Sequence, residues 1–369
     1  MTRSPTIVNV VDVVTLGESM VTFLPTRPGR LADVPSFERG IGGAESNVAC
    51  VLAALGHSTR WVSRVGADGF GSHLVERIAG YGVDVAAVRT DPSRPTGVYF
   101  RTAADRAAAD HEVAYYRAGS AASAMSAANT DLTAVRAGRV LHLSGITAAL
   151  SAQCLDLVRH LSRPTAGCPL LSFDVNHRPG LWTRADGAEV LLELARAADV
   201  VFVGEDEAEH TWGVTGGPAA IRALLPEPAL LVVKQAAQGA TAFAHGDAEQ
   251  PLRPDGGAPA TGRAPRPAAA PPVREPAPHV DVVAPVGAGD AFAAGFLSAT
   301  LRGLPLKHRL RHGHLMAAAA LTTPADLAAP PARDHADRLA ALDDEAWGRL
   351  RLGPGWTRTD RAQEEANTP

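Results

Sequence analysis

The most informative stretch of the chain, residues 282–303, reads VVAPVGAGDAFAAGFLSATLRG. A β-branched run leads into a turn of small residues, Gly287, Ala288 and Gly289, and Asp290 then opens an alanine-rich segment typical of a helix. Small residues let a backbone come close to a ligand, and the first amides of a helix have no internal partner, so they can bind an anion. The stretch therefore predicts a strand, a tight turn and a helix whose start forms a hole for phosphate.

Asp290 falls in the first turn of that helix, where the helix dipole favours a carboxylate. It could accept a proton from an incoming hydroxyl as a general base, or it could be an ordinary helix-start carboxylate. The chain contains neither GxxxxGKS nor GxxxxGKT, and Phe292 stands where a dinucleotide fingerprint needs its last glycine. The stretch is thus neither a Walker loop nor a Rossmann turn.

Elsewhere, short β-branched runs alternate with longer Ala- and Leu-rich stretches, which predicts a doubly wound α/β fold around a mostly parallel sheet. The strand candidates are VVDVVTL, STRWVSR, RVLHLSG, PLLSFDV, DVVFV, ALLVVK and HVDVVAP. The helix candidates lie at about 44–56, 70–80, 151–161, 186–197, 217–225, 287–301 and 308–321.

Two stretches break this alternation, at about 20–40 and 96–117, where polar residues alternate with apolar or aromatic ones. This pattern predicts a small antiparallel sheet acting as a lid. Residues 245–279 are rich in Pro, Ala, Gly and Arg, which predicts a disordered insertion because such a segment buries too little apolar surface. We therefore expect one domain over 1–353 and a flexible tail over 354–369.

Composition narrows the classes of partner. The 369 residues carry a formal net charge of -4, with no global positive field to attract nucleic acid or an anionic membrane. Cys50, Cys154 and Cys168 are too far apart for a CxxC pair, which is typical of a reducing compartment. No window approaches the roughly 20 apolar residues that a membrane span needs. The sequence predicts a cytoplasmic protein with small-molecule partners.

VGAGDAFAAGF resembles the signature of the PfkB, or ribokinase-like, carbohydrate kinases. Five further motifs follow in that family's order, covering most of the chain: GIGGAESNVACVLAALG (40–56), RVGADGFG (64–71), GEDEAE (204–209), VVKQAAQGA (232–240) and TTPADLAAP (322–330). The resemblance implies a ribokinase-like three-layer αβα fold, ATP and Mg²⁺ as cofactors, Asp290 as catalytic base, and the possibility of a homo-oligomer formed through the lid.

Within the family, the chain resembles 2-keto-3-deoxygluconate kinases in four segments: PTGVYF (95–100), YYRAGSAAS (115–123), LHLSGIT (141–147) and FDVNHRPGLW (173–182). The resemblance implies that Gly43 lies under the sugar, that Tyr99 and Tyr115 contact it from the lid, and that Arg117 and Arg178 hold its carboxylate. Asn47 is expected in the same pocket. Glu45 and Glu18 are weaker candidates, and Glu45 could simply cap its helix.

Elementary chemistry supports the two arginines, because a planar guanidinium holds a carboxylate through two parallel hydrogen bonds. Arg178 directly follows the strand LLSFDV, and ligands of open α/β sheets gather at the carboxyl ends of strands, although a surface cation is the alternative. Tyr99 and Tyr115 could instead pair across lid strands.

The nucleotide side rests on the resemblance as well. It assigns to ATP binding the residues Lys234, Gln235, Ala236, Gly239, Ala240 and His314. Lys234 would approach the phosphates or remain solvated at its strand end. Glu207 matches a family glutamate that organises magnesium-bound water, but a plain helix-start carboxylate is an equal alternative.

The chain departs from the family pattern at four positions. Ala284 replaces the usual Asp, Ala236 a Gly and Gly204 an Asn, while His314 stands where an Asn often flanks the adenine. The lost Asp puts a monovalent-cation site in doubt, and Gly204 weakens the magnesium network.

The sequence therefore predicts a kinase that transfers phosphate from ATP to a primary hydroxyl of a sugar acid, most simply 2-keto-3-deoxygluconate, giving the 6-phosphate. The alternatives are a kinase for another ketose, a 5-keto sugar acid or a nucleoside, and a sensor that binds a sugar acid without phosphorylating it.

Overall fold

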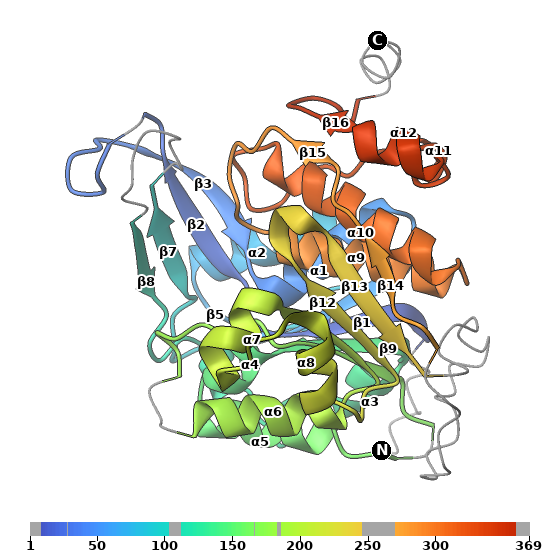
Figure 1. Cartoon of the computed structure of the whole chain (residues 1–369). Coiled ribbons are helices and arrows are strands. Elements are labelled where there is room, and N and C mark those ends of the chain that lie inside the picture. The colour runs from blue at the N-terminus through green and yellow to red at the C-terminus, as the bar shows by residue number, and fades with distance from the viewer. Residues whose placement is uncertain are drawn as a thin grey trace.

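An eight-stranded sheet forms the centre of the computed structural model, which describes residues 9–27, 29–102, 112–165, 167–182, 186–245 and 270–358 (Figure 1). In spatial order its strands are β14 (Val273–Glu275), β13 (Ala240–Ala244), β12 (Leu230–Lys234), β11 (Val200–Gly204), β10 (Leu170–Asp174), β9 (Gly138–Ser144), β1 (Val11–Leu16) and β4 (Thr59–Val62). The pairings from β12 to β4 are parallel, while β13 is antiparallel to both neighbours. The predicted mostly parallel sheet is confirmed.

Successive side chains of each strand enter opposite cores, as the two-residue period of a strand requires. Val13 and Val140 face one core, whereas Val14 and Leu141 face the other. The first core is covered by α1 (Ala44–Ala54), α9 (Ala288–Leu301), α10 (Leu306–Leu321), α11 (Arg333–Ala340) and α12 (Asp344–Arg349). The second is covered by α3 (Leu132–Arg136), α4 (Gly145–Ala149), α5 (Ala152–Leu161), α6 (Gly187–Ala197), α7 (Glu205–Trp212) and α8 (Gly217–Leu224). These layers give the three-layer αβα arrangement of Figure 1.

A smaller four-stranded sheet projects from one end of the molecule (Figure 1). Its order is β3 (Phe37–Gly42), β2 (Met20–Pro25), β7 (Val98–Arg101) and β8 (Val113–Tyr116). The two outer pairings are antiparallel and the central β2–β7 pairing is parallel. This sheet is the predicted lid; α2 (Gly69–Gly80) packs against its base, together with the short pair β5 (Arg64–Gly66) and β6 (Arg89–Asp91).

Three sequence predictions need correction. HVDVVAP does not enter the central sheet, because only β15 (His279–Val280) is a strand there and it pairs with β16 (Arg351–Leu352). The proposed insertion at 245–279 extends too far, since β14 joins the sheet edge; residues 246–269 lie outside the described residues. The predicted tail begins too early, because Trp356 is buried in the first core, and 359–369 are not described.

None of the helices that the structure describes combines the length and the apolar character needed to cross a bilayer.

Candidate active site

The candidate site lies where parallel strands of the central sheet end. Chain order runs outward from β1 to β4 in one direction and from β9 through β12 in the other, so the sheet reverses its winding between β1 and β9. Ligands of open α/β sheets bind beside such a reversal, at the carboxyl ends of the strands. Ser144, Asp174, Gly204 and Lys234 all occupy such ends.

The start of α9 faces this edge. Its N-cap, Gly287, has φ 75°, and an added Cβ would lie 2.2 Å from the carbonyl oxygen of Asp326, so only glycine fits. No side chain caps the helix, which leaves its first amides free of side-chain partners. The predicted turn and helix start at 287–290 therefore have the geometry of an anion hole.

Asp290 lies in the first turn of α9, partly buried. Its Oδ2 accepts a hydrogen bond of 2.9 Å from Nδ2 of Asn47, on α1. Burial raises its pKa to about 6; the Asn47 bond opposes that rise, the nearby Asp174 charge adds to it, and the Arg178 and Lys234 charges oppose it. A carboxylate with its pKa near 6 suits a general base at neutral pH.

Lys234, predicted to approach the phosphates, is paired with Asp174. Its Nζ lies 2.9 and 3.1 Å from the two carboxylate oxygens of Asp174, whose side chain is almost fully buried. The same Nζ would lie 3.5 Å from a Cβ placed on Gly289. The ammonium is therefore fixed by Asp174 beside the anion hole, a partner that sequence reasoning missed.

Glu207, the predicted organiser of magnesium-bound water, binds backbone instead. One oxygen accepts from the amide of Gly204 at 3.0 Å and the other from the amide of His177. Burial raises its pKa, while the nearby Lys234 lowers it. Within the described residues, no three His, Cys, Asp or Glu side chains form a ready metal cluster. Glu207 thus has a positioning role here, although its spare lone pairs could still accept water.

The loop after β12 has an unusual backbone. Ala236, in the place of a usual glycine, has φ 48°, whereas Gly239 has φ 115° and no space for a Cβ because Glu275 O lies 2.1 Å from that position. The Gln235 side chain donates to Glu205 at 2.7 Å and accepts from Thr241 at 2.9 Å. Ala240, which opens β13, is fully buried. The loop is held by side-chain bonds in spite of its strained alanine.

We predict that Ala236→Gly raises the free energy of unfolding by about 0.5–1 kcal/mol, because left-handed backbone costs an L-residue about 1–2 kcal/mol and the looser unfolded chain of glycine offsets part of the gain. Urea denaturation measures the difference. Ala237→Gly, one residue along and without positive φ, should be neutral or destabilising. Equal effects at both positions would contradict the strain.

His314 is not at an open adenine surface. It is buried on α10, where Nε2 lies 3.2 Å from the carbonyl of Glu275 and the ring packs edge-on against Phe292 at 5.2 Å. Burial lowers its pKa to about 4. In this structure His314 supports the interior beneath the β13–β14 edge.

The lid contributes one face to the site. Tyr99 and Tyr115 are register partners on β7 and β8, with ring centroids 5.3 Å apart. The Tyr99 hydroxyl donates to Asp326, and Arg101, two residues along the same strand face, binds Asp326 Oδ1 through Nε at 2.9 Å and Nη2 at 2.5 Å. Sequence reasoning missed Arg101 and Asp326, although the alternation in VYFR puts Tyr99 and Arg101 on one face.

The two predicted carboxylate ligands differ sharply. Arg117 is already paired with Glu18, whose side chain is 1% exposed. Arg178 is exposed, donates to the carbonyl of His177 at 3.1 Å, and lies close enough to Asp290 to affect its pKa. Gly43 is the N-cap of α1, the helix that carries Asn47 in its first turns. The structure brings Arg178 and Asn47 to Asp290 and leaves Arg117 with a protein partner.

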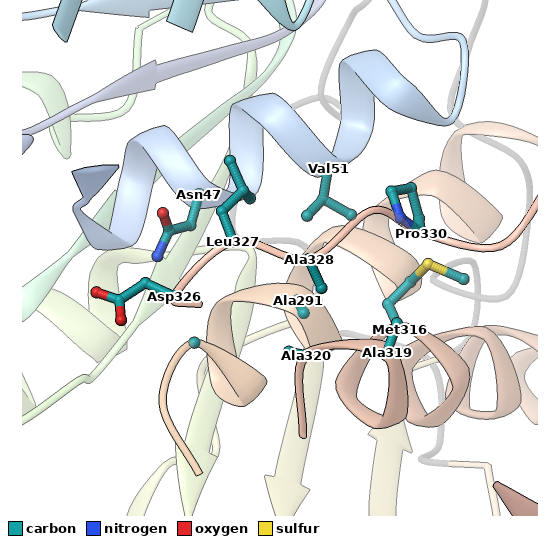
Figure 2. Close-up of a pocket in the computed structure, with 11 residues that line it drawn as sticks. Asn47, Val51, Ala291, Met316, Ala319, Ala320, Asp326, Leu327, Ala328 and Pro330 are labelled. Atoms are coloured by element: carbon teal, nitrogen blue, oxygen red, sulfur yellow. The ribbon is translucent and has the colours of Figure 1, made fainter. Parts of the chain in front are cut away.

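Asn47 and Asp326 lie at one end of a small cavity, and Val51, Met316 and Pro330 line the rest (Figure 2). Its volume is about 10 Å³, room for roughly one water molecule. A sugar does not fit there. Ligands would have to meet Asp290 from the side where Arg178 is exposed.

A helix start with the geometry of an anion hole, a neighbouring carboxylate of raised pKa and a small sheet beside a doubly wound sheet are the arrangement expected of the ribokinase-like class of sugar kinases. The chain belongs to the pfkB family of carbohydrate kinases, which it matches over residues 11–256 and 272–333.

Among curated relatives, the chain is 33% identical to 2-dehydro-3-deoxygluconokinase of Bacillus subtilis (strain 168) over 327 residues, covering 88% of this chain and 93% of that protein. It is 30% identical to 2-dehydro-3-deoxygluconokinase of Thermoproteus tenax, covering 81% and 85%. The crystal structure of a PfkB protein from Polaromonas sp. JS666 superposes with a TM-score of 0.72 at 31% identity, covering 90% of this chain and all of that one.

Proposed function

We propose that this carbohydrate kinase transfers the terminal phosphoryl group of ATP to the primary hydroxyl of 2-keto-3-deoxygluconate, also called 2-dehydro-3-deoxygluconate. The observation that carries the proposal is the partly buried Asp290, which Asn47 holds beside the uncapped start of α9. Two relatives at about 30% identity that carry this activity support the acceptor.

In the proposed mechanism, Asp290 takes the proton of the acceptor hydroxyl as that oxygen attacks phosphorus. The amides of Gly287, Ala288 and Gly289 bind the negative charge that spreads over the transferring phosphoryl. Lys234, held by Asp174, supplies a fixed positive charge beside them. The lid strands close over the sugar and exclude water, which would otherwise accept the phosphoryl.

The residues present fit a nucleotide better than a protein-built metal cage. Glu207 binds two backbone amides and Asp174 binds Lys234, so both carboxylates are partly engaged. Mg²⁺ commonly uses one or two carboxylates, waters and substrate phosphates, and would neutralise phosphate charge when bound with ATP. Glu207 would contact it through water. Ala284 offers no side-chain oxygen for a monovalent cation.

The nucleotide would border the loop of Lys234, Gln235, Ala236, Gly239 and Ala240, with His314 supporting it from below. The sugar would lie between Gly43, Asn47 and the lid tyrosines Tyr99 and Tyr115. Arg178 and Arg117 would hold its carboxylate, and the buried Asp326 would fix the hydroxyl of Tyr99. Such a set suits an acidic sugar because guanidinium groups bind carboxylates in two-point geometry.

ADP release in the presence of ATP, Mg²⁺ and a panel of acceptors tests the proposal. The panel holds 2-keto-3-deoxygluconate, fructose, a 5-keto sugar acid and a nucleoside. We expect the highest kcat/KM with 2-keto-3-deoxygluconate. A higher kcat/KM with another acceptor would make that acceptor the substrate. Binding of the sugar acid with no ADP release in the presence of any acceptor would instead favour a sensor that binds the sugar acid without phosphorylating it.

We also propose that the lid mediates a homo-oligomer in the cytoplasm. The lid face opposite Tyr99 and Tyr115 carries neighbouring aromatic rings: Phe23 stacks on Phe100 with centroids 4.7 Å apart, Tyr116 meets Phe100 edge-on at 5.9 Å, and Tyr116 is 66% exposed. Such a patch on a surface is typical of an interface. Light scattering should give a molar mass at least twice that of the chain. Tyr116→Arg should reduce the measured mass to that of a single chain. A parent protein that is a monomer would exclude the oligomer.

A further inference from the structure

A buried ion pair closes the base of the lid. Glu18 follows β1 and leads into β2, a central strand of the lid sheet, whereas Arg117 follows β8, one of its edge strands. Their side chains are 1% and 10% exposed, and Arg117 Nη2 contacts Glu18 Oε2. Glu18 Oε1 also accepts a hydrogen bond of 2.5 Å from the hydroxyl of Ser120. Glu18 is therefore held firmly, with its charge directed at Arg117.

This pair belongs to the same face as the residues proposed to hold the sugar. The Arg117 guanidinium carbon lies 5.8 Å from the centre of the Tyr115 ring, and that ring lies 5.3 Å from the ring of Tyr99. The Tyr99 hydroxyl binds Asp326, which shares a cavity lining with Asn47. Arg117 Nε has no hydrogen-bond partner in the described structure. The guanidinium thus keeps one unused donor, at a buried atom, although its charge is already matched.

We propose that Glu18 is a specificity-determining residue: it occupies Arg117 as a carboxylate of the protein, so that an acidic sugar must share this arginine and binds less tightly than it otherwise would. The inference rests on the proposed function, because it concerns how the same site reads the charge of the acceptor. Glu18 thereby limits how much more tightly the site binds an acidic sugar than a neutral ketose.

The weaker binding of the acid is explained by the balance of charge around Arg117, a site that is largely shielded from water. With Glu18 ionised, Arg117 and Glu18 together are neutral, and a second carboxylate on Arg117 meets the repulsion of the first. The acid then depends on Arg178 for its positive charge. Arg178 is exposed, and no ion pair with it is found in the described structure. A neutral ketose is indifferent to this balance, because it brings no charge to Arg117.

Glu18→Gln tests the proposal, since glutamine keeps the size and an acceptor oxygen for Arg117 but removes the charge. We expect the Kd of 2-keto-3-deoxygluconate, measured by calorimetry without ATP, to fall about tenfold, or about 1.4 kcal/mol. The Kd of fructose should stay within about twofold. The ratio of kcat/KM for acid over fructose should rise by the same factor as the acid affinity. Glu38→Gln, on the exposed side of β3, removes an equal lid charge and should change neither sugar.

Thermal melts guard against a folding artefact. Glu18→Gln leaves the Arg117 charge uncompensated, so the free variant should melt lower than the parent, and the sugar acid should raise its Tm more than it raises that of the parent. If Glu18→Gln does not fold, Glu18→Asp withdraws the carboxylate by one methylene and should lower the acid Kd in the same direction, by less.

Weaker acid binding in Glu18→Gln, or equal changes for acid and fructose, would overturn the proposal and make Glu18 a purely structural partner. Failure of the proposed function looks different. In that case the parent releases ADP with fructose but not with the sugar acid, irrespective of Glu18. A parent that uses the acid, with an unchanged acid-to-fructose ratio in Glu18→Gln, keeps the substrate and rejects only the role of Glu18.

Discussion

Asp290→Asn is expected to lower kcat by about 10²- to 10⁴-fold, the usual contribution of a general base, while the dissociation constants of sugar and ATP change little. Asparagine keeps the shape of the side chain and can still accept from Asn47, which now donates to Asp290 at 2.9 Å. Only the proton acceptor is lost. Turnover, measured by ADP release, should therefore fall, while binding, measured by calorimetry, should stay nearly unchanged.

The control is Asp281→Asn, nine positions earlier and exposed, which should leave turnover unchanged. A change of only a few-fold at Asp290 would show that another group takes the proton. In the parent, kcat/KM should fall below about pH 6 because burial raises the pKa of Asp290 to about 6 and the protonated form cannot accept a proton. The residual activity of Asp290→Asn should lack that acid limb.

The groups around Asp290 set the position of this limb. Asp174 raises the pKa of Asp290, while Arg178 and Lys234 lower it, and Glu45 is a second buried carboxyl within electrostatic reach. Glu45 accepts hydrogen bonds of 2.7 Å from both Ser144 and Thr147, and its burial raises its pKa to about 7. Two neighbouring carboxyls with raised pKa values oppose each other's ionisation, so the acid limb should be broader than that of a single group.

Local patterns predicted those parts of the molecule that depend on local chemistry. The buried strands, the main helices and the glycine turn before Asp290 follow from apolar periodicity, from helix-end signals and from the small residues at 287–289. Sequence reasoning missed the pair of Asp174 and Lys234, which lie 60 positions apart, but the site edge itself followed because parallel strands bring their carboxyl ends together. Here sequence and topology agree.

Features that depend on distant partners were not predictable in the same way. Nothing near Arg117 shows that Glu18, 99 positions earlier, neutralises it, and nothing near Arg101 indicates Asp326, 225 positions later. The edge strand β14 was hidden because three ordered residues barely change the composition of a long Pro- and Ala-rich window. The positive φ of Ala236 could not be predicted from the sequence for a related reason, because the surrounding loop imposes this conformation.

Arg101→Met is expected to lower the free energy of unfolding by about 3–5 kcal/mol, since it leaves the carboxylate of Asp326 buried without its cation. Both side chains are 2% exposed, Arg101 Nε and Nη2 bind Asp326 Oδ1, and Nη2 also binds the carbonyl of Pro324 at 2.7 Å. These contacts join the lid strand β7 to the segment that packs against Gly287. Chemical denaturation measures the loss.

The matched control is Arg89→Met, which removes an arginine whose side chain is 53% exposed and 3.6 Å from Asp131; exposed pairs contribute at most about 1 kcal/mol. The double variant Arg101→Met, Asp326→Leu should recover much of the lost stability, because apolar residues of similar volume often replace a buried ion pair at little cost. It should not recover catalysis, since Tyr99 loses the acceptor that fixes its hydroxyl. If Arg101→Met costs no more than Arg89→Met, the pair does not hold the lid to the body of the protein. If the double variant regains full turnover, Asp326 supports the fold and is not needed to position Tyr99.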